Sequence, residues 1–339
     1  MSTDDLILVT GAGGFIGGHL VGYLQRTLGH RQIRAADIKP LDEWYQVHPG
    51  VESLSLDVSQ REHALRVTTG ARHVYNLAAD MGGMGFIETH KAECMLSVLI
   101  NTHMLMAARA CGVERYFFAS SACVYAADKQ TDADVTALKE ADAYPAMPED
   151  GYGWEKLFSE RMCRHFREDF GLRTYAGRYH NVYGPHGTYD GGREKAPAAI
   201  CRKVIEAKMS GRHEIEIWGD GEQTRSFMYI DDCLIGTTRL LASDIIEPLN
   251  IGSDELVSIN RLVDIVEKIA GVKLARRYKL DAPKGVRGRN SDNDLIKRLM
   301  GWAPSVRLED GMERTYRWIH DEMRSGQASR ANGASRAAD

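Results

Sequence analysis

The chain has 339 residues, of which 43% are hydrophobic and 27% are charged, and its formal net charge is −4. This length suffices for a nucleotide-binding domain plus a smaller second domain, and the negative charge gives a nucleic-acid partner no electrostatic support. No apolar run approaches the roughly eighteen residues of a membrane span, and the acidic start lacks the basic segment of a signal peptide, so we expect a soluble, cytoplasmic protein with no membrane partner.

Cysteine and histidine spacing gives no sign of a metal or a disulfide framework. The six cysteines are widely spaced and include no Cys-x-x-Cys pair. No two of the twelve histidines stand at the spacing of a metalloprotease. We therefore expect no bound metal.

The first predicted element is a short buried strand over residues 5–10, followed by a glycine-rich turn and a helix over about 18–28. Gly11, Gly14 and Gly17 form a Gly-x-x-Gly-x-x-Gly pattern, and Phe15 and Ile16 lie within the same turn. Glycines at this spacing let a pyrophosphate approach the N-terminus of the helix, whose free N–H groups favour an anion. A glycine turn that binds no nucleotide is the alternative reading.

A second predicted strand, over residues 32–36, ends at Asp37, twenty residues beyond Gly17. A carboxylate at this position accepts hydrogen bonds from a ribose 2′-hydroxyl and repels a 2′-phosphate. The pattern therefore predicts NAD rather than NADP as the cofactor.

The alternation of predicted strands and helices continues through the first half of the chain. Predicted strands over 51–56, 73–77 and 116–119 lead to Asp57, Ala78 and Ser120, and a helix is expected over 92–111. Strands that alternate with helices imply a parallel sheet covered on both faces, with ligands at the carboxyl ends of the strands. We predict an α/β fold with a Rossmann-type doubly wound parallel sheet and a smaller α/β substrate-binding domain.

Tyr152 and Lys156 stand at i and i+4 of a predicted helix, so they share one face. A neighbouring ammonium group favours phenolate over phenol, so we expect the pKa of Tyr152 to fall from about 10 toward neutrality. Tyr152 then becomes an acid/base for a sugar or alcohol hydroxyl. Taken alone, Tyr-x-x-x-Lys is typical of a surface helix pair.

The domain boundary is drawn where the pattern changes after a strand over 172–176. We assign residues 1–178 and about 226–253 to an NAD-binding domain, because a helix over 227–242 and a strand over 249–251 return to the sheet. About 179–225 and 254–324, with a helix over 197–209 and a strand over 214–218, form the substrate domain. Residues 325–339 are small and polar, which predicts a disordered tail.

Several motifs resemble the extended short-chain dehydrogenase/reductase superfamily that acts on nucleotide sugars: the glycine turn, NLAA at 76–79, SSA at 120–122, and Tyr152 with Lys156. Longer motifs resemble the GDP-mannose 3,5-epimerase family within it. These are DMGGMGFI at 80–87, GGREKAPAA at 191–199, WGDGEQTRSF at 218–227 and VRGRNSDN at 286–293. The similarity runs from about residue 5 to 324.

The resemblance implies the catalytic residues. NAD takes a hydride from C4 of the hexose while Tyr152 takes the hydroxyl proton, Ser121 hydrogen-bonds the same oxygen and Lys156 holds the ribose. A C4 ketone acidifies the hydrogens at C3 and C5, and Cys123 and Lys195 match the acid/base pair that inverts those carbons. A nearby NAD⁺ or lysine could lower the thiol pKa. Considered without the surrounding motifs, Cys123 could be a small buried hydrophobic residue and Lys195 a solvated charge on a loop.

The resemblance also implies a set of residues that bind the GDP-sugar. The set is Gly83, Met84, Ser121, Asn181, Glu194, Lys195, Ala196, Lys203, Gln223, Arg225 and Arg287. Arg289 and Arg202 are expected to join the cations among them in a diphosphate clamp, although each could belong to a solvated loop. The role of His180 is left open.

The implied activity is epimerisation of a GDP-hexose at C3, C5 or both, with NAD recycled in each turnover. Alternatives are another nucleotide-sugar 3-, 5- or 4-epimerase, a 4,6-dehydratase, or a non-catalytic NAD-binding scaffold or sensor. A dehydratase is expected to carry an acidic residue where this chain has Ala122 and Cys123. Two helices, 92–111 and 152–170, carry apolar residues on more than one face, which predicts a homodimer if that surplus is not buried against the chain's own sheet.

Overall fold

The computed structural model describes residues 2–282 and 285–336. Its first half alternates strands and helices. In chain order the elements are β1 (Ile7–Thr10), α1 (Phe15–Arg26), β2 (Ile33–Asp37), β3 (Glu52–Ser55), α2 (Arg61–Thr68), β4 (His73–Asn76), α3 (Met84–Thr89), α4 (Lys91–Ala110), β5 (Arg115–Ser121), α5 (Tyr152–Phe170) and β6 (Arg173–Tyr179).

The second half is more irregular. Its elements are β7 (Val182–Tyr183), α6 (Ala196–Ser210), β8 (Glu214–Trp218), β9 (Thr224–Ser226), β10 (Met228–Tyr229), α7 (Ile230–Ala242), β11 (Leu249–Ile251), β12 (Leu256–Ser258), α8 (Ile259–Ala270), β13 (Ala275–Lys279), β14 (Gly288–Arg289), α9 (Asp294–Met300) and α10 (Leu308–Arg336).

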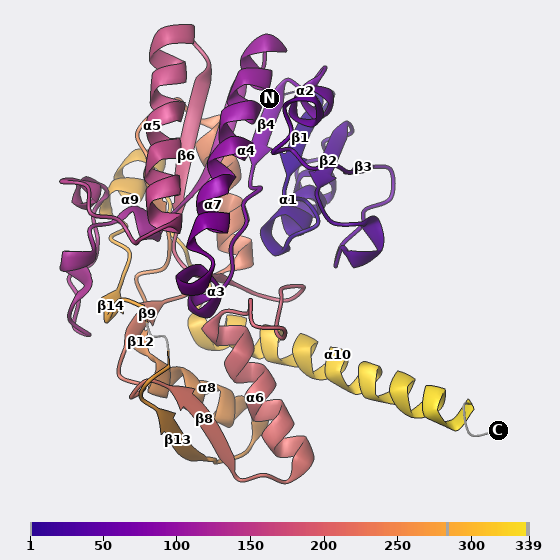
Figure 1. Ribbon diagram of the computed structural model, residues 1–339, viewed down its shortest axis with the longest axis vertical. Helices are drawn as coiled ribbons and strands as arrows, with labels where there is room; N and C mark the ends of the chain where they lie inside the picture. The colour runs from indigo at the N-terminus through magenta and orange to yellow at the C-terminus, as the bar shows by residue number, and fades with distance from the viewer. Residues whose placement is uncertain (1, 283–284, 337–339) are drawn as a thin grey trace.

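A seven-stranded parallel sheet with the order β11-β6-β5-β4-β1-β2-β3 forms the upper body of the molecule (Figure 1). The strand order reverses at β1, as in a doubly wound sheet. Ile7 and Val9 pack into one core with α1 and α7, whereas Leu8 packs into another with α4. Successive residues of a strand face opposite sides, so both faces of this sheet are buried. The predicted Rossmann-type fold is confirmed.

The chain leaves this sheet after β6 and returns to it for α7 and β11. Between and after these returns, α6 packs against α8 and α10, and β8 pairs with β13, below the sheet (Figure 1). α9, which the sequence division assigned to the substrate domain, packs against β11 at the sheet edge. The division of the chain into two domains stays a prediction.

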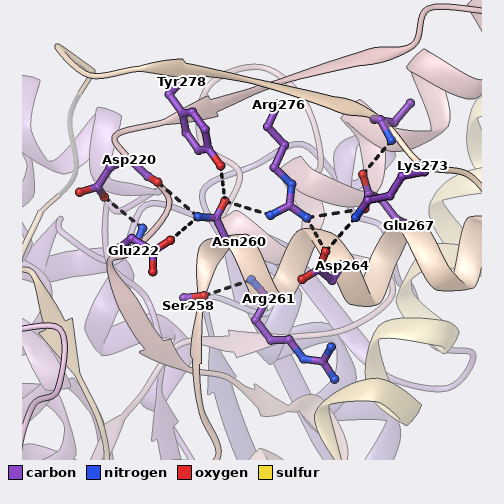
Figure 2. Close-up of polar contacts among 11 residues, drawn as sticks. Asp220, Glu222, Ser258, Asn260, Arg261, Asp264, Glu267, Lys273, Arg276 and Tyr278 are labelled. Atoms are coloured by element: carbon purple, nitrogen blue, oxygen red, sulfur yellow. Dashed lines mark hydrogen bonds and ion pairs between the residues drawn. The ribbon is translucent and has the colours of Figure 1, made fainter.

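The loop between β8 and β9 is held by a polar network from α8 and β13 (Figure 2). Asn260 of α8 donates to Glu222 Oε1 at 2.6 Å, and Arg276 of β13 donates to the Asn260 amide oxygen at 3.2 Å. Arg276 also pairs with Asp264 of α8. These contacts tie the loop that precedes Arg225 to a helix whose opposite face, including Leu262 and Val266, is buried in the core.

The last helix, α10, overlaps the stretch predicted as a disordered tail, and the disorder of that tail stays a prediction. α10 continues to Arg336, whereas a disordered tail was predicted from residue 325, and residues 337–339 lie outside the described residues. The stretch 325–336 contains no proline. Extending an existing helix costs far less than nucleating one, so a small, polar sequence can prolong a helix that the preceding residues have started.

Candidate active site at the carboxyl edge of the sheet

The glycine turn between β1 and α1 leaves space that side chains would fill. Gly11 has φ +69°, and a Cβ on Gly17 would lie 2.1 Å from the Gly11 carbonyl oxygen. α1 begins at Phe15, followed by Ile16, and Gly14 at its N-cap supplies no side-chain hydrogen bond. The first amides of the helix therefore keep their capacity to bind an anion, as a pyrophosphate requires.

The carboxyl ends of β2, β3 and β4 bring the other predicted cofactor residues to this turn. Asp37 Oδ2 accepts a hydrogen bond from the Gly13 amide at 3.0 Å. The Leu56 amide, next to Asp57, donates to the Asp37 carbonyl at 2.8 Å. A Cβ on Gly11 would lie 2.9 Å from the Ala78 amide nitrogen. The arrangement of a glycine cradle, a helix N-terminus and a carboxylate at the end of β2 fits NAD.

Tyr152 and Lys156 share one buried face at the start of α5. A Cβ on Gly153 would lie 2.3 Å from the Cys123 carbonyl oxygen, so glycine lets the helix pack directly on the segment after β5. The Lys156 ammonium nitrogen is 5.3 Å from the centroid of the Tyr152 ring and 3.3 Å from Glu155 Oε2. Ser121 hydrogen-bonds the Tyr152 side chain. The geometry therefore brings the predicted tyrosine, lysine and serine together.

The expected fall in the pKa of Tyr152 is wrong for this structure. Burial raises the pKa of its phenol well above the ordinary 10, and the nearby Cys123 and Glu155 raise it further. The Ser121 hydrogen bond acts in the opposite direction. Spacing alone indicated a cation beside the phenol, but it could not show that Glu155, which offsets the charge of Lys156, lies beside both.

Cys123 lies in a short 3₁₀ turn after β5, and its side chain is buried. Its amide donates to Ser121 Oγ at 3.2 Å, and Arg289 Nη1 lies 3.6 Å from its sulfur. Burial and the Glu149 carboxylate raise the pKa of the thiol to about 11, although Arg289 and Ser121 oppose the rise. Cys123 is therefore a neutral thiol near neutral pH, and the lowered pKa expected from the sequence is wrong for this structure.

Lys195 is carried to the site by a loop that is fastened to the segment after β4. The Gly83 amide donates to the Arg193 carbonyl at 3.0 Å, and Arg193 Nη1 donates to Asp80 Oδ1 at 2.7 Å. Lys195 is half-buried at the N-cap of α6, and its charge interacts with Cys123. Burial lowers the pKa of its ammonium below the ordinary 10.5. A lysine with a lowered pKa loses its proton more readily and can serve as a base.

Most residues predicted to bind the sugar nucleotide form hydrogen bonds or ion pairs with other groups of the chain. Asn181, at φ +26°, donates to the Ser226 carbonyl at 3.0 Å, and Lys203 donates to the Glu216 carbonyl at 3.0 Å. Gln223 donates to the Trp218 carbonyl at 2.8 Å.

The remaining members of this set lie beside or at the start of two helices. Glu194 pairs with Arg202, and Ala196 begins α6. Met84 begins α3, and its methyl carbon would lie 2.8 Å from a Cβ on Gly285.

The arginines predicted to form the diphosphate clamp differ in burial and in the residues they contact. Arg287 is partly exposed and pairs with Asp220 at 2.8 Å, and Arg225 is buried, with Nη2 donating to the Val286 carbonyl at 2.6 Å. Arg289 is buried against Cys123 and Glu149, and Arg202 pairs with Glu194 and Glu206, so both contact carboxylates, as Arg287 does. Cations in a sequence cannot reveal which of them the fold pairs internally.

Glu149 is the residue of this site that sequence reasoning missed. Its amide donates to the Cys123 carbonyl at 3.0 Å, and its carboxylate pairs with Arg289. No spacing links residues 123, 149 and 289. The one available signal was the position of Glu149 shortly before the Tyr152 helix.

His180, whose role was open, is a buried core residue. It shares a hydrogen bond with Asn250 Oδ1 at 2.9 Å. Burial lowers its pKa to about 3, so the ring is neutral.

The described part of the chain comprises residues 2–282 and 285–336. No helix there combines the length and the apolarity needed to cross a membrane. No cluster of three or more histidine, cysteine, aspartate or glutamate side chains there could hold a metal ion.

Comparisons with known proteins agree with this geometry. GDP-mannose 3,5-epimerase of Arabidopsis thaliana is 47% identical over 95% of this chain and 84% of its own length. GDP-mannose 3,5-epimerase 1 of Oryza sativa subsp. japonica is 48% identical over 94% of this chain and 82% of its own.

Solved structures of nucleotide-sugar epimerases are also similar. UDP-glucose 4-epimerase of Thermotoga maritima has a TM-score of 0.83 at 24% identity, over 94% of this chain and 99% of that one, which shows the fold alone. A variant of UDP-glucuronic acid 4-epimerase from Bacillus cereus, solved with a UDP-sugar analogue and NAD, has a TM-score of 0.78 at 26% identity over 93% of this chain and 99% of that one.

The model of the NAD dependent epimerase/dehydratase family matches residues 7–252, which include the glycine turn, Asp37, Cys123, Tyr152 and Lys195. The chain therefore belongs to the NAD dependent epimerase/dehydratase family.

Proposed function

We propose that this protein is a GDP-mannose 3,5-epimerase, which oxidises a GDP-hexose at C4, inverts C3 and C5 through enolates and reduces C4 again to give a GDP-L-hexose. The observation that carries the proposal is the meeting of two acid/base pairs at one edge of the sheet. Tyr152 and Ser121 form one pair, and Cys123 with Lys195 forms the other. The 47% identity to a GDP-mannose 3,5-epimerase over 95% of the chain supports the choice of substrate.

The first pair handles the hydroxyl at C4. A bound NAD⁺ would supply the hydride acceptor for C4 and, once reduced, the hydride donor for the return step. Tyr152 takes the hydroxyl proton, Ser121 hydrogen-bonds the same oxygen, and Lys156 holds the nicotinamide ribose. Gly11, Gly14, Gly17 and Asp37 line the cradle for the rest of the cofactor.

The second pair handles the carbons beside the ketone. A C4 ketone acidifies the hydrogens at C3 and C5. Inversion then needs one group that removes a proton and another that returns a proton from the opposite face. A neutral lysine and a protonated thiol suit these two roles, and they come from different segments of the chain, which is what opposite faces of one ring require.

The remaining site residues are proposed to hold the nucleotide sugar. Gly83 and Met84 line the sugar, together with the loop of Glu194 and Ala196. Asn181, Lys203, Gln223, Arg225 and Arg287 surround the GDP diphosphate and nucleoside.

Exchange of solvent deuterium into C3 and C5 separates the redox step from inversion. In heavy water with GDP-mannose, the Cys123→Ser variant should keep NAD binding and C4 oxidation but lose epimerisation, because a serine hydroxyl is a much weaker acid than a thiol. Tyr152→Phe should lose exchange altogether, because no ketone forms. Mass spectrometry of the recovered sugars measures both effects.

The same experiment distinguishes the alternative functions. Wild-type inversion by Cys123→Ser would remove the thiol from the mechanism, and wild-type exchange by Tyr152→Phe would refute the ketone. Exchange at one carbon alone would make the enzyme a single-centre epimerase, and loss of water from the sugar would make it a dehydratase. No turnover of GDP-, UDP- or dTDP-hexoses would favour an NAD-binding scaffold.

We also propose that two copies of the chain associate through α4 and α5. These helices pack side by side, and their outer face exposes Met95, Leu96, Leu99 and Phe158 to between 42% and 59%. Met104, Leu105 and Leu157 are instead buried against the chain's own core, so only part of the apolar surplus is available. Light scattering at micromolar concentration should give a dimeric mass for the wild type and a monomeric one for Phe158→Glu, and a monomeric wild type would refute the dimer.

A cytoplasmic location is proposed from the chemistry of Cys123. The thiol must stay reduced to exchange protons, and all six cysteines are free. Reduced thiols persist in the cytosol. Cell fractionation followed by immunoblotting tests this location.

A further inference from the structure

Arg289 and Glu149 form a buried pair around the Cys123 thiol. The side chains of Arg289 and Glu149 are 5% and 11% exposed and make an ion pair. Arg289 Nη1 lies 3.6 Å from the Cys123 sulfur, and its Nε donates to Gln130 Oε1 at 2.6 Å. The Glu149 carboxylate, which pairs with Arg289, is near enough to the thiol to raise its pKa. The sulfur therefore contacts a cation whose own ion-pair partner is a carboxylate.

The fold holds this cluster through contacts of the backbone. The Glu149 amide donates to the Cys123 carbonyl at 3.0 Å, which fixes the segment before α5 against the 3₁₀ turn. A Cβ on Gly288 would lie 2.2 Å from the Asp132 carbonyl oxygen, so glycine is needed for β14 to approach this closely. Arg289, the next residue, is thereby carried to the sulfur.

A thiol that exchanges protons with carbon must change its charge in a buried place. A thiolate there is stabilised by a guanidinium at hydrogen-bond distance, and a nearby carboxylate favours the neutral thiol over the thiolate. The other titratable groups that influence the sulfur are Arg225, Lys195 and Tyr152. The pKa of Cys123 follows the same logic, since Glu149 raises it and Arg289 lowers it.

We propose that Arg289 and Glu149 are positioning residues that hold the Cys123 sulfur in place and stabilise it in both charge states, with Arg289 supporting the thiolate and Glu149 the thiol. The inference rests on the proposed function. When Cys123 gives its proton to the sugar, the S–H bond breaks, a C–H bond forms from the electron pair of the enolate, and the negative charge stays on sulfur beside Arg289. In the reverse direction the C–H bond breaks, its electron pair stays in the enolate, and the thiolate takes the proton to form a neutral S–H near Glu149.

The Raman S–H band of Cys123 tests this directly and needs no ligand. Subtracting the spectrum of the same protein with Cys123→Ser isolates this thiol among the six. In Glu149→Gln the band should be lost at a pH about one unit below that of the wild type, because the carboxylate that disfavours the thiolate is gone. In Arg289→Gln the band should persist to a pH about one unit above the pH at which the wild type loses it.

A second buried pair provides the matched control. Arg178 and Glu160 are 3% and 4% exposed and pair at 2.7 Å. Arg178→Gln should lower the midpoint of thermal unfolding and leave the Cys123 S–H band unchanged. Circular dichroism fixes the pH range in which each variant is folded. If Arg289→Gln does not fold, Arg289→Lys takes its place. The Cys123 S–H band of Arg289→Lys should be lost within about half a pH unit of the pH at which the wild type loses it, since the positive charge remains.

Opposite shifts in the two variants support the inference, because a purely structural role would not move the thiol in two directions. Equal shifts, or none, would overturn it. With GDP-mannose, Arg289→Gln should lose roughly 100-fold in deuterium exchange at C3 and C5 while C4 oxidation stays near the wild-type rate. Opposite band shifts in a protein whose wild type does not turn over GDP-mannose would uphold the thiol assignment and refute the proposed function.

Discussion

Gly83→Ala tests how closely the two loops of the site must approach each other. A Cβ on Gly83 would lie 2.4 Å from the Glu194 carbonyl oxygen, whereas ordinary van der Waals contact begins at 3.4 Å. The atom struck is backbone, so no side chain can rotate away. The loop that carries Lys195 must therefore retreat by about 1 Å, and the hydrogen bond from the Gly83 amide to the Arg193 carbonyl lengthens with it.

A retreat of this size matters for proton transfer, which requires hydrogen-bond distance. A misplacement of about 1 Å can cost roughly 100-fold in rate. Gly83→Ala should therefore slow deuterium exchange into C3 and C5 of GDP-mannose by about that factor. Transient NADH absorbance, which follows C4 oxidation, should change much less, because Tyr152 and Ser121 lie on α5 and β5.

Gly85→Ala is the matched control. Its Cβ would lie 3.6 Å from the Trp218 ring, which is an ordinary contact. The variant should keep wild-type exchange. Wild-type exchange in Gly83→Ala as well would show that the Lys195 loop does not set the rate, and an equal loss of C4 oxidation would show that the substitution disrupts binding of the whole substrate.

Three further predictions concern charge. Burial lowers the pKa of Lys195 below 10.5, so the fraction of neutral amine increases as the pH rises through that lowered value. Deuterium exchange at C3 and C5 should therefore increase with pH and level off below pH 10.5. Lys195→Arg, measured over the same pH series, should lack this rise. Arg178→Gln strands the Glu160 carboxylate in the core and should lower the free energy of unfolding by about 3–5 kcal/mol in urea titrations, and a loss near zero would contradict the buried pair. Asp37→Asn removes a charge at the end of β2 and should weaken NAD binding about tenfold while NADP binding improves, as fluorescence titration would reveal; unchanged selectivity would remove Asp37 from ribose recognition.

The fold class and the glycine turn that would hold the cofactor could be predicted from local sequence patterns. Buried strands have a period of two and helices one of 3.6, and glycines at fixed spacing mark a turn that larger residues cannot make. These signals are local, so the strand ending at Asp37 and the helix beginning at Tyr152 were predicted at the observed residues.

The surroundings of the reactive groups could not be predicted, because they form only when distant segments of the chain fold together. The pKa of Tyr152 and of Cys123 depends on burial and on charges that come from distant positions, such as Glu149 and Arg289, and no spacing encodes such a meeting. Arginines that could equally have bound a diphosphate were divided by the fold between surface and core. Electrostatic energies depend on distance and local dielectric in three dimensions, which are fixed only when the chain has closed around the site.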